Sequence, residues 1–318
     1  MRRFALLLLL CGCHAISDED RELLTSCQRN APTYFEGGKL SQALTQAERG
    51  LEIDPDDYKL QAIRGATLLR ASEQNPKLLP EATRQLQVVY DRRSPMRHEP
   101  YVLLYYALSQ QKQGLRSRGE AIRLEDRARR NPAQKDDLLE AAADEQERAD
   151  ERLREADEVL GYLLDVGSQL RLSYKHRLQI ALQLKDDEGF DRSVTAYLKE
   201  AEREQESVRR EVERTQTPDY EAEQYKLLRS LRAEEIEVRE LYGNWLFHRG
   251  QLEGTLAQLD RMLELDPQRS NDYYNRGRVL TSLGRKDAAK RDFRMFLSMS
   301  RLPDDNDKKT FAVNALKQ

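Results

Sequence analysis

The side chains that most often catalyse reactions or bind metals are few and scattered in this sequence. The four histidines lie far apart, without a second ligand at metal-binding spacing, at His14, His98, His176 and His248. Pairs of acids such as Asp56-Asp57 stand at expected turns or helix starts, where they complement the helix dipole. No glycine-rich phosphate loop, nucleophile elbow or strand pattern is found. The sequence therefore predicts a protein that is not an enzyme and that binds no metal and no cofactor.

The first thirteen residues differ from the rest. Arg2 and Arg3 precede an apolar run from Phe4 to Leu10, which is too short to span a bilayer, since spanning takes about 20 residues. A charged start followed by a short apolar stretch is typical of a secretory signal. The string that ends the run, Leu10-Cys11-Gly12-Cys13, resembles a bacterial lipobox.

The lipobox resemblance implies an anchor and a location. Residues 1–12 would be the lipoprotein signal peptide, Cys13 would carry the lipid, and residues 13–18 would form the tether. His14, directly after the lipidated cysteine, would favour the outer membrane of a bacterial envelope, facing the periplasm. A plain signal peptide and a cytosolic chain are the alternatives. With Cys13 lipidated, Cys27 has no partner for a disulfide bond within the chain.

Composition favours helices. Charged residues make up 34% of the 318 residues, compared with about 25% in an average globular protein, and the mean hydropathy is -0.83. So polar a chain fits an elongated protein with one apolar stripe per helix better than a compact core. The net charge of -3 and the pI near 6.0 argue against nucleic-acid binding, which needs a basic surface.

Three segments repeat one spacing of small and apolar residues. Two of them end in Leu-Glu-Ile-Asp-Pro55 and Leu-Glu-Leu-Asp-Pro267, and the third follows the second directly. Gly243 and Gly277 are 34 residues apart. This spacing resembles the tetratricopeptide repeat, a helix–turn–helix unit of 34 residues that stacks on its neighbours into a solenoid.

The spacing has a physical reason. A glycine with positive φ ends the first helix of each unit, which predicts turns at Gly38, Gly250 and Gly284. A small residue on the first helix lets the second helix approach closely. Weaker copies cover residues 58–95, 98–131 and 174–207, and the copy at 98–131 would turn at Gly114.

A different pattern lies between the repeats. Small or apolar residues recur every three or four positions, as in a coiled coil, at Ala142, Gln146, Ala149, Leu153, Ala156, Leu160 and Leu163. A second such seam contains Leu198, Ala201, Gln205, Val208 and Val212, and Pro218 marks a break before a helix over 221–247. These seams favour long antiparallel hairpins. The alternative is one or two unpaired charged helices.

The expected fold is therefore all-α: a tetratricopeptide-type α-solenoid with long inserted helical hairpins. N-terminal repeats would cover 19–134. Long charged helices, with a degenerate unit at about 174–207, would cover 135–235. A C-terminal repeat pair would cover 236–300. A capping helix would cover 301–318, with its N-cap at Asp304.

The resemblance also implies where a partner would bind. The first helices of such repeats line a concave groove, here at Glu240, Asn244, Phe247, His248, Asn271, Tyr274 and Arg278. Asn244, Asn275 and Lys309 match three of the five positions with which some repeats clamp a peptide carboxylate, but Glu240 and Asp305 replace the two lysines. Two acids would repel a carboxylate. The expected ligand is a protein or peptide with a mixed or basic segment.

These observations favour a non-catalytic, membrane-anchored scaffold or adaptor of the bacterial envelope. One alternative is an assembly lipoprotein resembling pilus-secretin pilotins or outer-membrane barrel-assembly lipoproteins. A second alternative is a structural spacer that self-associates through its long helices. The sequence leaves the partner and the oligomeric state open.

Overall fold

The computed structural model describes residues 16–91, 93–168, 170–214 and 218–317. These residues form thirteen α-helices and two short 3-10 helices, and no β-strand, which confirms the predicted all-α class. The predicted signal peptide and Cys13 lie outside the described residues. The chain divides into an N-terminal unit, Met1–Asp187, and a C-terminal unit, Glu188–Gln318.

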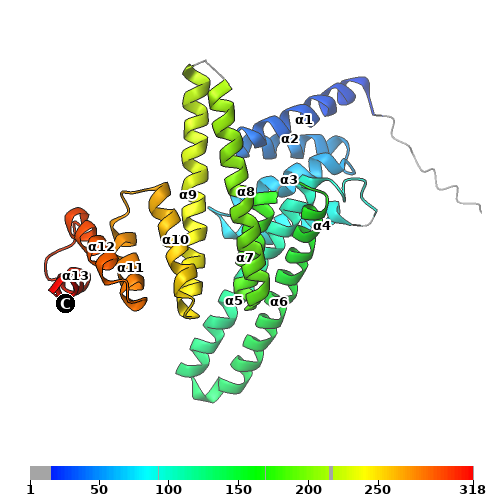
Figure 1. Ribbon diagram of the computed structural model, residues 1–318. Coiled ribbons are helices and arrows are strands. Elements are labelled where there is room, and N and C mark those ends of the chain that lie inside the picture. The colour runs from blue at the N-terminus through cyan, green and yellow to red at the C-terminus, as the bar shows by residue number, and fades with distance from the viewer. Residues whose placement is uncertain (1–15, 92, 169, 215–217, 318) are drawn as a thin grey trace, which may run out of the picture. The chain divides into compact units, whose positions relative to one another are not determined.

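The N-terminal unit begins with two antiparallel helix pairs (Figure 1). Helix α1 (Asp18–Glu36) packs on α2 (Leu40–Ile53), and α3 (Tyr58–Ala71) packs on α4 (Leu79–Tyr90) after a 3-10 turn (Pro76–Leu78). Small residues make the close contact in the first pair, since Ala31 and Ala43 are fully buried. Gly38 has a φ of 72°, as the predicted turn requires.

A long hairpin follows. Helix α5 (Pro100–Arg130) lies along α6 (Lys135–Asp165), joined by a 3-10 turn (Pro132–Gln134), and α7 (Leu170–Leu184) packs on α6 and α5. The predicted seam on α6 is confirmed, because its apolar members are all buried: Ala142, Ala149, Leu153, Ala156, Leu160 and Leu163. The long helices of this unit are therefore paired.

The predicted turn at Gly114 was wrong. Helix α5 runs through this glycine without a break, and Gly114 faces α6. A Cβ here would lie 2.9 Å from Cγ of Leu153 and 3.0 Å from the carbonyl oxygen of Ala149. Gly114 thus serves the close approach of two helices, and the copy at 98–131 is no helix–turn–helix.

One of the four histidines is half-buried between α7 and α5. Nδ1 of His176 lies 2.8 Å from Oε1 of Gln111. Burial, with the nearby Lys175 and Lys112 charges, lowers the pKa of His176 to about 4. This imidazole is therefore neutral at neutral pH and joins two helices through a hydrogen bond.

The C-terminal unit begins with a second pair of long helices. Helices α8 (Asp187–Arg214) and α9 (Pro218–His248) lie side by side and antiparallel (Figure 1), as contacts from Gln205 to Glu235 and from Asp191 to Tyr242 show. In the second predicted seam Leu198, Ala201 and Gln205 are buried. Because α9 is continuous, the expected boundary at 235/236 falls within it. The division between the two units falls inside the predicted repeat 174–207.

Shorter helices complete this unit: α10 (Leu252–Leu265), α11 (Ser270–Ser282), α12 (Lys286–Met299) and α13 (Asp307–Lys317). The turns at Gly250 and Gly284 have φ values of 70° and 75°, as predicted. The predicted N-cap of the last helix was wrong. Oδ1 of Asn306 accepts the hydrogen bond from the Lys308 backbone at 3.0 Å, whereas Asp304 pairs with Lys309.

Candidate functional site

A pocket of about 130 Å³ lies between α9, α10 and α11 of the C-terminal unit. Four of the seven predicted groove residues line it together: Glu240, Asn244, Phe247 and Arg278. The first three lie on successive turns of α9, and Arg278 reaches the pocket from α11. The packing of the helices thus brings side chains that are more than 30 residues apart in the sequence to the same pocket. Phe247 is 38% exposed.

The other three predicted residues are not in the pocket. Tyr274 belongs to the core, with only 7% of its surface exposed and its ring centroid 5.2 Å from that of Phe296. Asn271 accepts a hydrogen bond from Nζ of Lys308 at 3.1 Å. His248 is exposed at the end of α9, with its ring centroid 6.1 Å from that of Phe247.

Sequence reasoning missed the pocket's floor, because it considered only the first helix of each repeat. The second helix, α10, contributes Thr255, Gln258, Leu259 and Met262, and the remaining lining residues are Arg239, Gly243, Asp272, Asn275 and Val279. The sequence did contain one indication of this side of the pocket. Thr255 stands where alanine is usual in the repeat, and a hydroxyl group at such a buried position needs a polar partner.

The two acids that line the pocket, Glu240 and Asp272, share one basic partner. Oε2 of Glu240 lies 2.9 Å from a guanidinium nitrogen of Arg269, which also pairs with Asp272. Burial raises the pKa of Asp272, an effect that Arg269 opposes. The charge of Glu240 is therefore partly compensated by Arg269.

The base at the pocket mouth has no such partner. Arg278 is exposed and lies over the Tyr274 ring, 5.9 Å from its centroid, and no described carboxylate forms an ion pair with it. Lys308 lies near the same ring, at 5.6 Å. The exposed amides of Asn244 and Asn275 stand beside this positive charge. Arg278 is thus a charged residue of the pocket lining without an ion pair to a described carboxylate, whereas Glu240 and Asp272 share the one positive charge of Arg269.

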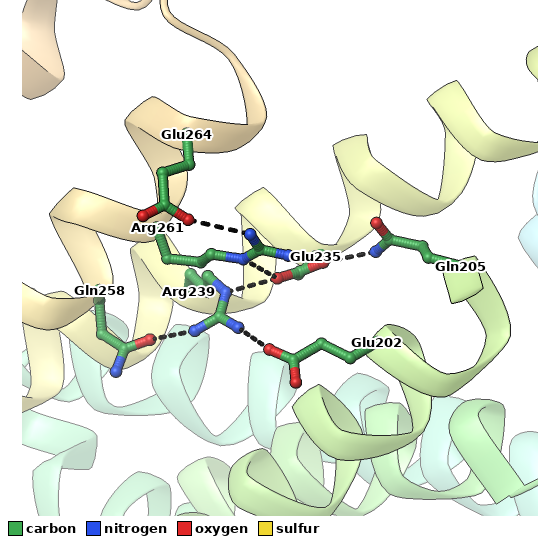
Figure 2. Close-up of polar contacts among 7 residues, drawn as sticks. All are labelled: Glu202, Gln205, Glu235, Arg239, Gln258, Arg261 and Glu264. Carbon is green, nitrogen blue, oxygen red and sulfur yellow. Dashed lines mark hydrogen bonds and ion pairs between the residues drawn. The ribbon is translucent and has the colours of Figure 1, made fainter. Parts of the chain in front are cut away.

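A buried ion network holds the pocket wall in place (Figure 2). Glu235 on α9 is fully buried, and its carboxylate accepts hydrogen bonds from Nε of Arg239 at 2.7 Å and from the Gln205 amide of α8. Arg239 also donates to Glu202 of α8 and Gln258 of α10, both at 2.8 Å. Since Arg239 and Gln258 line the pocket, the network fixes the geometry of its wall across three helices.

Arg261 of α10 completes the network. Its Nε lies 3.4 Å from the Glu235 carboxylate, and its Nη1 donates to Glu264 at 3.0 Å. Glu264 is 64% exposed, so this end of the network reaches solvent. Two arginines thus face one fully buried carboxylate.

The N-terminal unit has a larger hollow of about 680 Å³. Apolar and aromatic side chains of α1, α3 and α5 make up most of its lining, among them Phe35, Leu60, Ile63, Leu104 and Tyr105. Burial and the charges of Glu99 and Asp57 raise the pKa of Tyr101 at its edge to about 12. Charged side chains also line this hollow, namely Glu36, Lys59 and Glu99.

The described residues offer neither a metal site nor a membrane-spanning helix. No three His, Cys, Asp or Glu side chains among them gather as a metal ion would require. None of the helices described is both long and apolar enough to cross a membrane.

The described helices define an all-α protein built from successive antiparallel helix pairs. One similar solved structure is a thermophilic TPR protein from Thermus thermophilus, with 14% identity over 93% of this chain and 100% of that chain and a TM-score of 0.32. Another is a tetratricopeptide repeat protein from Parabacteroides merdae, with 14% identity over 93% of this chain and 98% of that chain and a TM-score of 0.34. A third is Nro1, a hypoxic regulator of sterol synthesis described as a nuclear import adaptor, with 12% identity over 94% of this chain and 92% of that chain and a TM-score of 0.46.

No protein-family model and no curated protein matches the chain. With identities of 12 to 14% and TM-scores below 0.5, the likeness to the three solved structures is too distant to indicate a partner.

Proposed function

We propose that this protein is a non-catalytic, membrane-anchored scaffold of the bacterial cell envelope that binds a peptide segment in the α9–α11 pocket. The amides of Asn244 and Asn275 suit the backbone of an extended segment, and Phe247 offers an apolar contact. The observation that carries the proposal is Arg278, an exposed arginine at the pocket mouth without an ion pair to any described residue.

The charge of the site changes the expected ligand. A mixed or basic segment was expected because Glu240 and Asp305 stand where two lysines would bind a carboxylate, but Arg269 pairs with Glu240 and partly compensates its charge. Arg278 then remains as the charge available to a ligand, and opposite charges across an interface give specificity. We therefore propose an acidic segment with a large apolar side chain.

Arg278→Glu should weaken peptide binding at least about tenfold, because it replaces an attractive charge by a repulsive one. A tenfold loss corresponds to about 1.4 kcal/mol of binding free energy. Peptides selected from a random displayed library on the wild-type protein would be titrated against each variant by fluorescence anisotropy. Phe247→Ala should also reduce affinity. Tyr274 is unsuitable for this test, since its ring is part of the core.

Arg294→Glu is the matched control, because Arg294 is exposed on α12 and does not line the pocket. It should leave binding unchanged. Selected peptides that are basic, or an equal loss of affinity in Arg294→Glu and Arg278→Glu, would contradict the proposal.

The anchor forms the second part of the proposal. Its support is the order of charge, apolar run and cysteine at residues 2–13. Cys13→Ser should move the protein from the membrane fraction to the soluble fraction and abolish palmitate labelling in a bacterial host. Cys11→Ser changes the neighbouring cysteine and should leave both properties intact. Retention of Cys13→Ser in the membrane would rule the lipid anchor out.

A further inference from the structure

The half of the α5–α6 hairpin nearest its connecting turn exposes large apolar side chains. Leu115 is 41% exposed, Ile122 is 55% exposed, and Leu139 is 40% exposed. Elsewhere on this hairpin the leucines of the α6 seam are fully buried. Three large apolar side chains left in solvent on one short stretch are a candidate interaction surface.

These side chains share one side of the hairpin. Leu115, Ile122 and Arg129 follow each other at steps of seven residues, which places them on one stripe of α5. Arg129 and Leu139 line a common hollow of about 440 Å³ at the end of the hairpin. The stripe of α5 and Leu139 of α6 therefore form one continuous surface, here named the hairpin face.

The two helices differ in charge, since α5 is mainly basic and α6 mainly acidic at this end of the hairpin, although Glu125 of α5 and Lys135 of α6 also line the hollow. On α5, Arg123 and Arg129 are 69% and 75% exposed and pair only with acids one turn away on their own helix, at 2.9 and 3.3 Å. Arg130 is exposed beside them. On α6, the stripe next to Leu139 contains Asp136, Glu140 and Glu147, all exposed. Exposed pairs within one helix contribute little stability, so the arginines stay available for a stronger partner.

A surface with one basic and one acidic ridge is complementary to itself. A two-fold axis parallel to the hairpin, lying between two facing copies, puts α5 of one copy over α6 of the other. Each arginine ridge then meets an acidic ridge, and Leu115, Ile122 and Leu139 lie between them. A ligand of a single charge would satisfy only one of the two ridges, which favours a second copy as the occupant.

We propose that two copies of this protein associate through the hairpin face, forming a four-helix arrangement in which each α5 packs on the partner's α6. About four turns of each helix take part, which gives a contact on the order of 1,000 Å² in total. That area lies at the lower end for specific interfaces, so the dimer forms in a concentration-dependent way.

A charge exchange tests this dimer directly. One variant carries Arg123→Glu, Arg129→Glu and Arg130→Glu, and the other carries Asp136→Lys, Glu140→Lys and Glu147→Lys. Sedimentation velocity of the full chain, in one detergent throughout, should show a wild-type dimer that increases with concentration. Each variant alone should dimerise at least tenfold more weakly, because like charges then face each other.

An equimolar mixture of the two variants should restore the dimer, because Glu on α5 of one now faces Lys on α6 of the other. This recovery also shows that both variants are folded. Arg294→Glu, an exposed charge reversal on α12 outside the hairpin, should leave the wild-type dimer unchanged. A wild-type protein that stays monomeric, a dimer unaffected by both variants, or a mixture that stays monomeric would each overturn the proposal.

Discussion

Glu235→Ala should lower the free energy of unfolding of the C-terminal unit by about 3–5 kcal/mol, the range found when one partner of a buried ion pair is removed. Glu235 is fully buried, and Arg239 beside it is only 8% exposed. Without the carboxylate, the Arg239 charge keeps only Glu202 and Gln258, and the buried Gln205 amide loses its acceptor. The desolvation cost of these groups is then no longer offset.

The chain contains a natural reporter for this measurement. Trp245 is the only tryptophan and lies on α9, 5.3 Å from the ring of Phe190 on α8. Urea unfolding followed by tryptophan fluorescence therefore reports on the unit that contains Glu235. Glu264→Ala removes an acid of the same network that is 64% exposed, and it should cost less than about 1 kcal/mol. Equal losses in the two variants would contradict a special role for the buried carboxylate.

A combined variant distinguishes the contribution of the network to stability from its contribution to the pocket wall. Replacing the buried group as a whole, with Glu235→Leu, Arg239→Met and Gln205→Leu, removes the charges together with their desolvation cost. Such replacements are often neutral or stabilising. We expect this variant to unfold at a higher urea concentration than Glu235→Ala, and to lose the pocket wall that Arg239 forms.

The helix pairs were predictable because local chemistry decides them. Gly38, Gly250 and Gly284 take positive φ at turns that only glycine adopts easily, and each follows an amphipathic helix. The α6 seam was predictable for a similar reason, since one apolar face at heptad spacing has to pack on another helix.

The presence of a glycine in the sequence does not reveal whether its positive φ or its missing side chain is required. Gly114 stands at the same repeat position as the turn glycines, yet it is helical and gives Leu153 room to pack. Sequence spacing cannot distinguish a glycine needed for its φ from one needed for its missing side chain. The difference lies in the neighbouring helix α6, far along the chain.

Glu235 was missed although a signal existed. Leu228, Leu231, Glu235, Val238 and Tyr242 follow steps of three and four residues, so Glu235 occupies a core position of α9. A charged residue on a heptad seam predicts a buried ion pair. Its partner Arg239 follows at i, i+4 on the same helix, but Arg261 and Gln205 could not be predicted, because they come from helices whose packing the pattern does not fix.

Placing the site residues required knowledge of the packing around them. Glu240, Asn244, Phe247 and Arg278 line one pocket, as expected from repeat positions, whereas the Tyr274 ring turns towards Phe296 and Phe311. Phe311 belongs to α13, the last helix. A capping helix over 301–318 was predicted, but the repeat pattern did not indicate that it would cover Tyr274 of α11.

Gly277→Ala should destabilise the C-terminal unit by about 1–2 kcal/mol, because it overfills a packed core. A Cβ at Gly277 would lie 2.7 Å from Cε1 of Phe293, closer than real Cβ contacts allow. Phe293 is 1% exposed and packs against the rings of Tyr274 and Phe311, so it has little room to move. The clash therefore outweighs the better helix propensity of alanine, worth about 1 kcal/mol.

Gly243→Ala, at the corresponding position of the preceding repeat, should have the opposite sign. A Cβ there would meet Cβ of Gln258 at 3.5 Å, an ordinary contact, so the gain in helix propensity remains and stability should rise by up to about 1 kcal/mol. Both variants are compared by urea unfolding of Trp245 fluorescence. If the two substitutions shift the midpoint in the same direction, the close approach of α12 to α11 at Gly277 is not what selects glycine there.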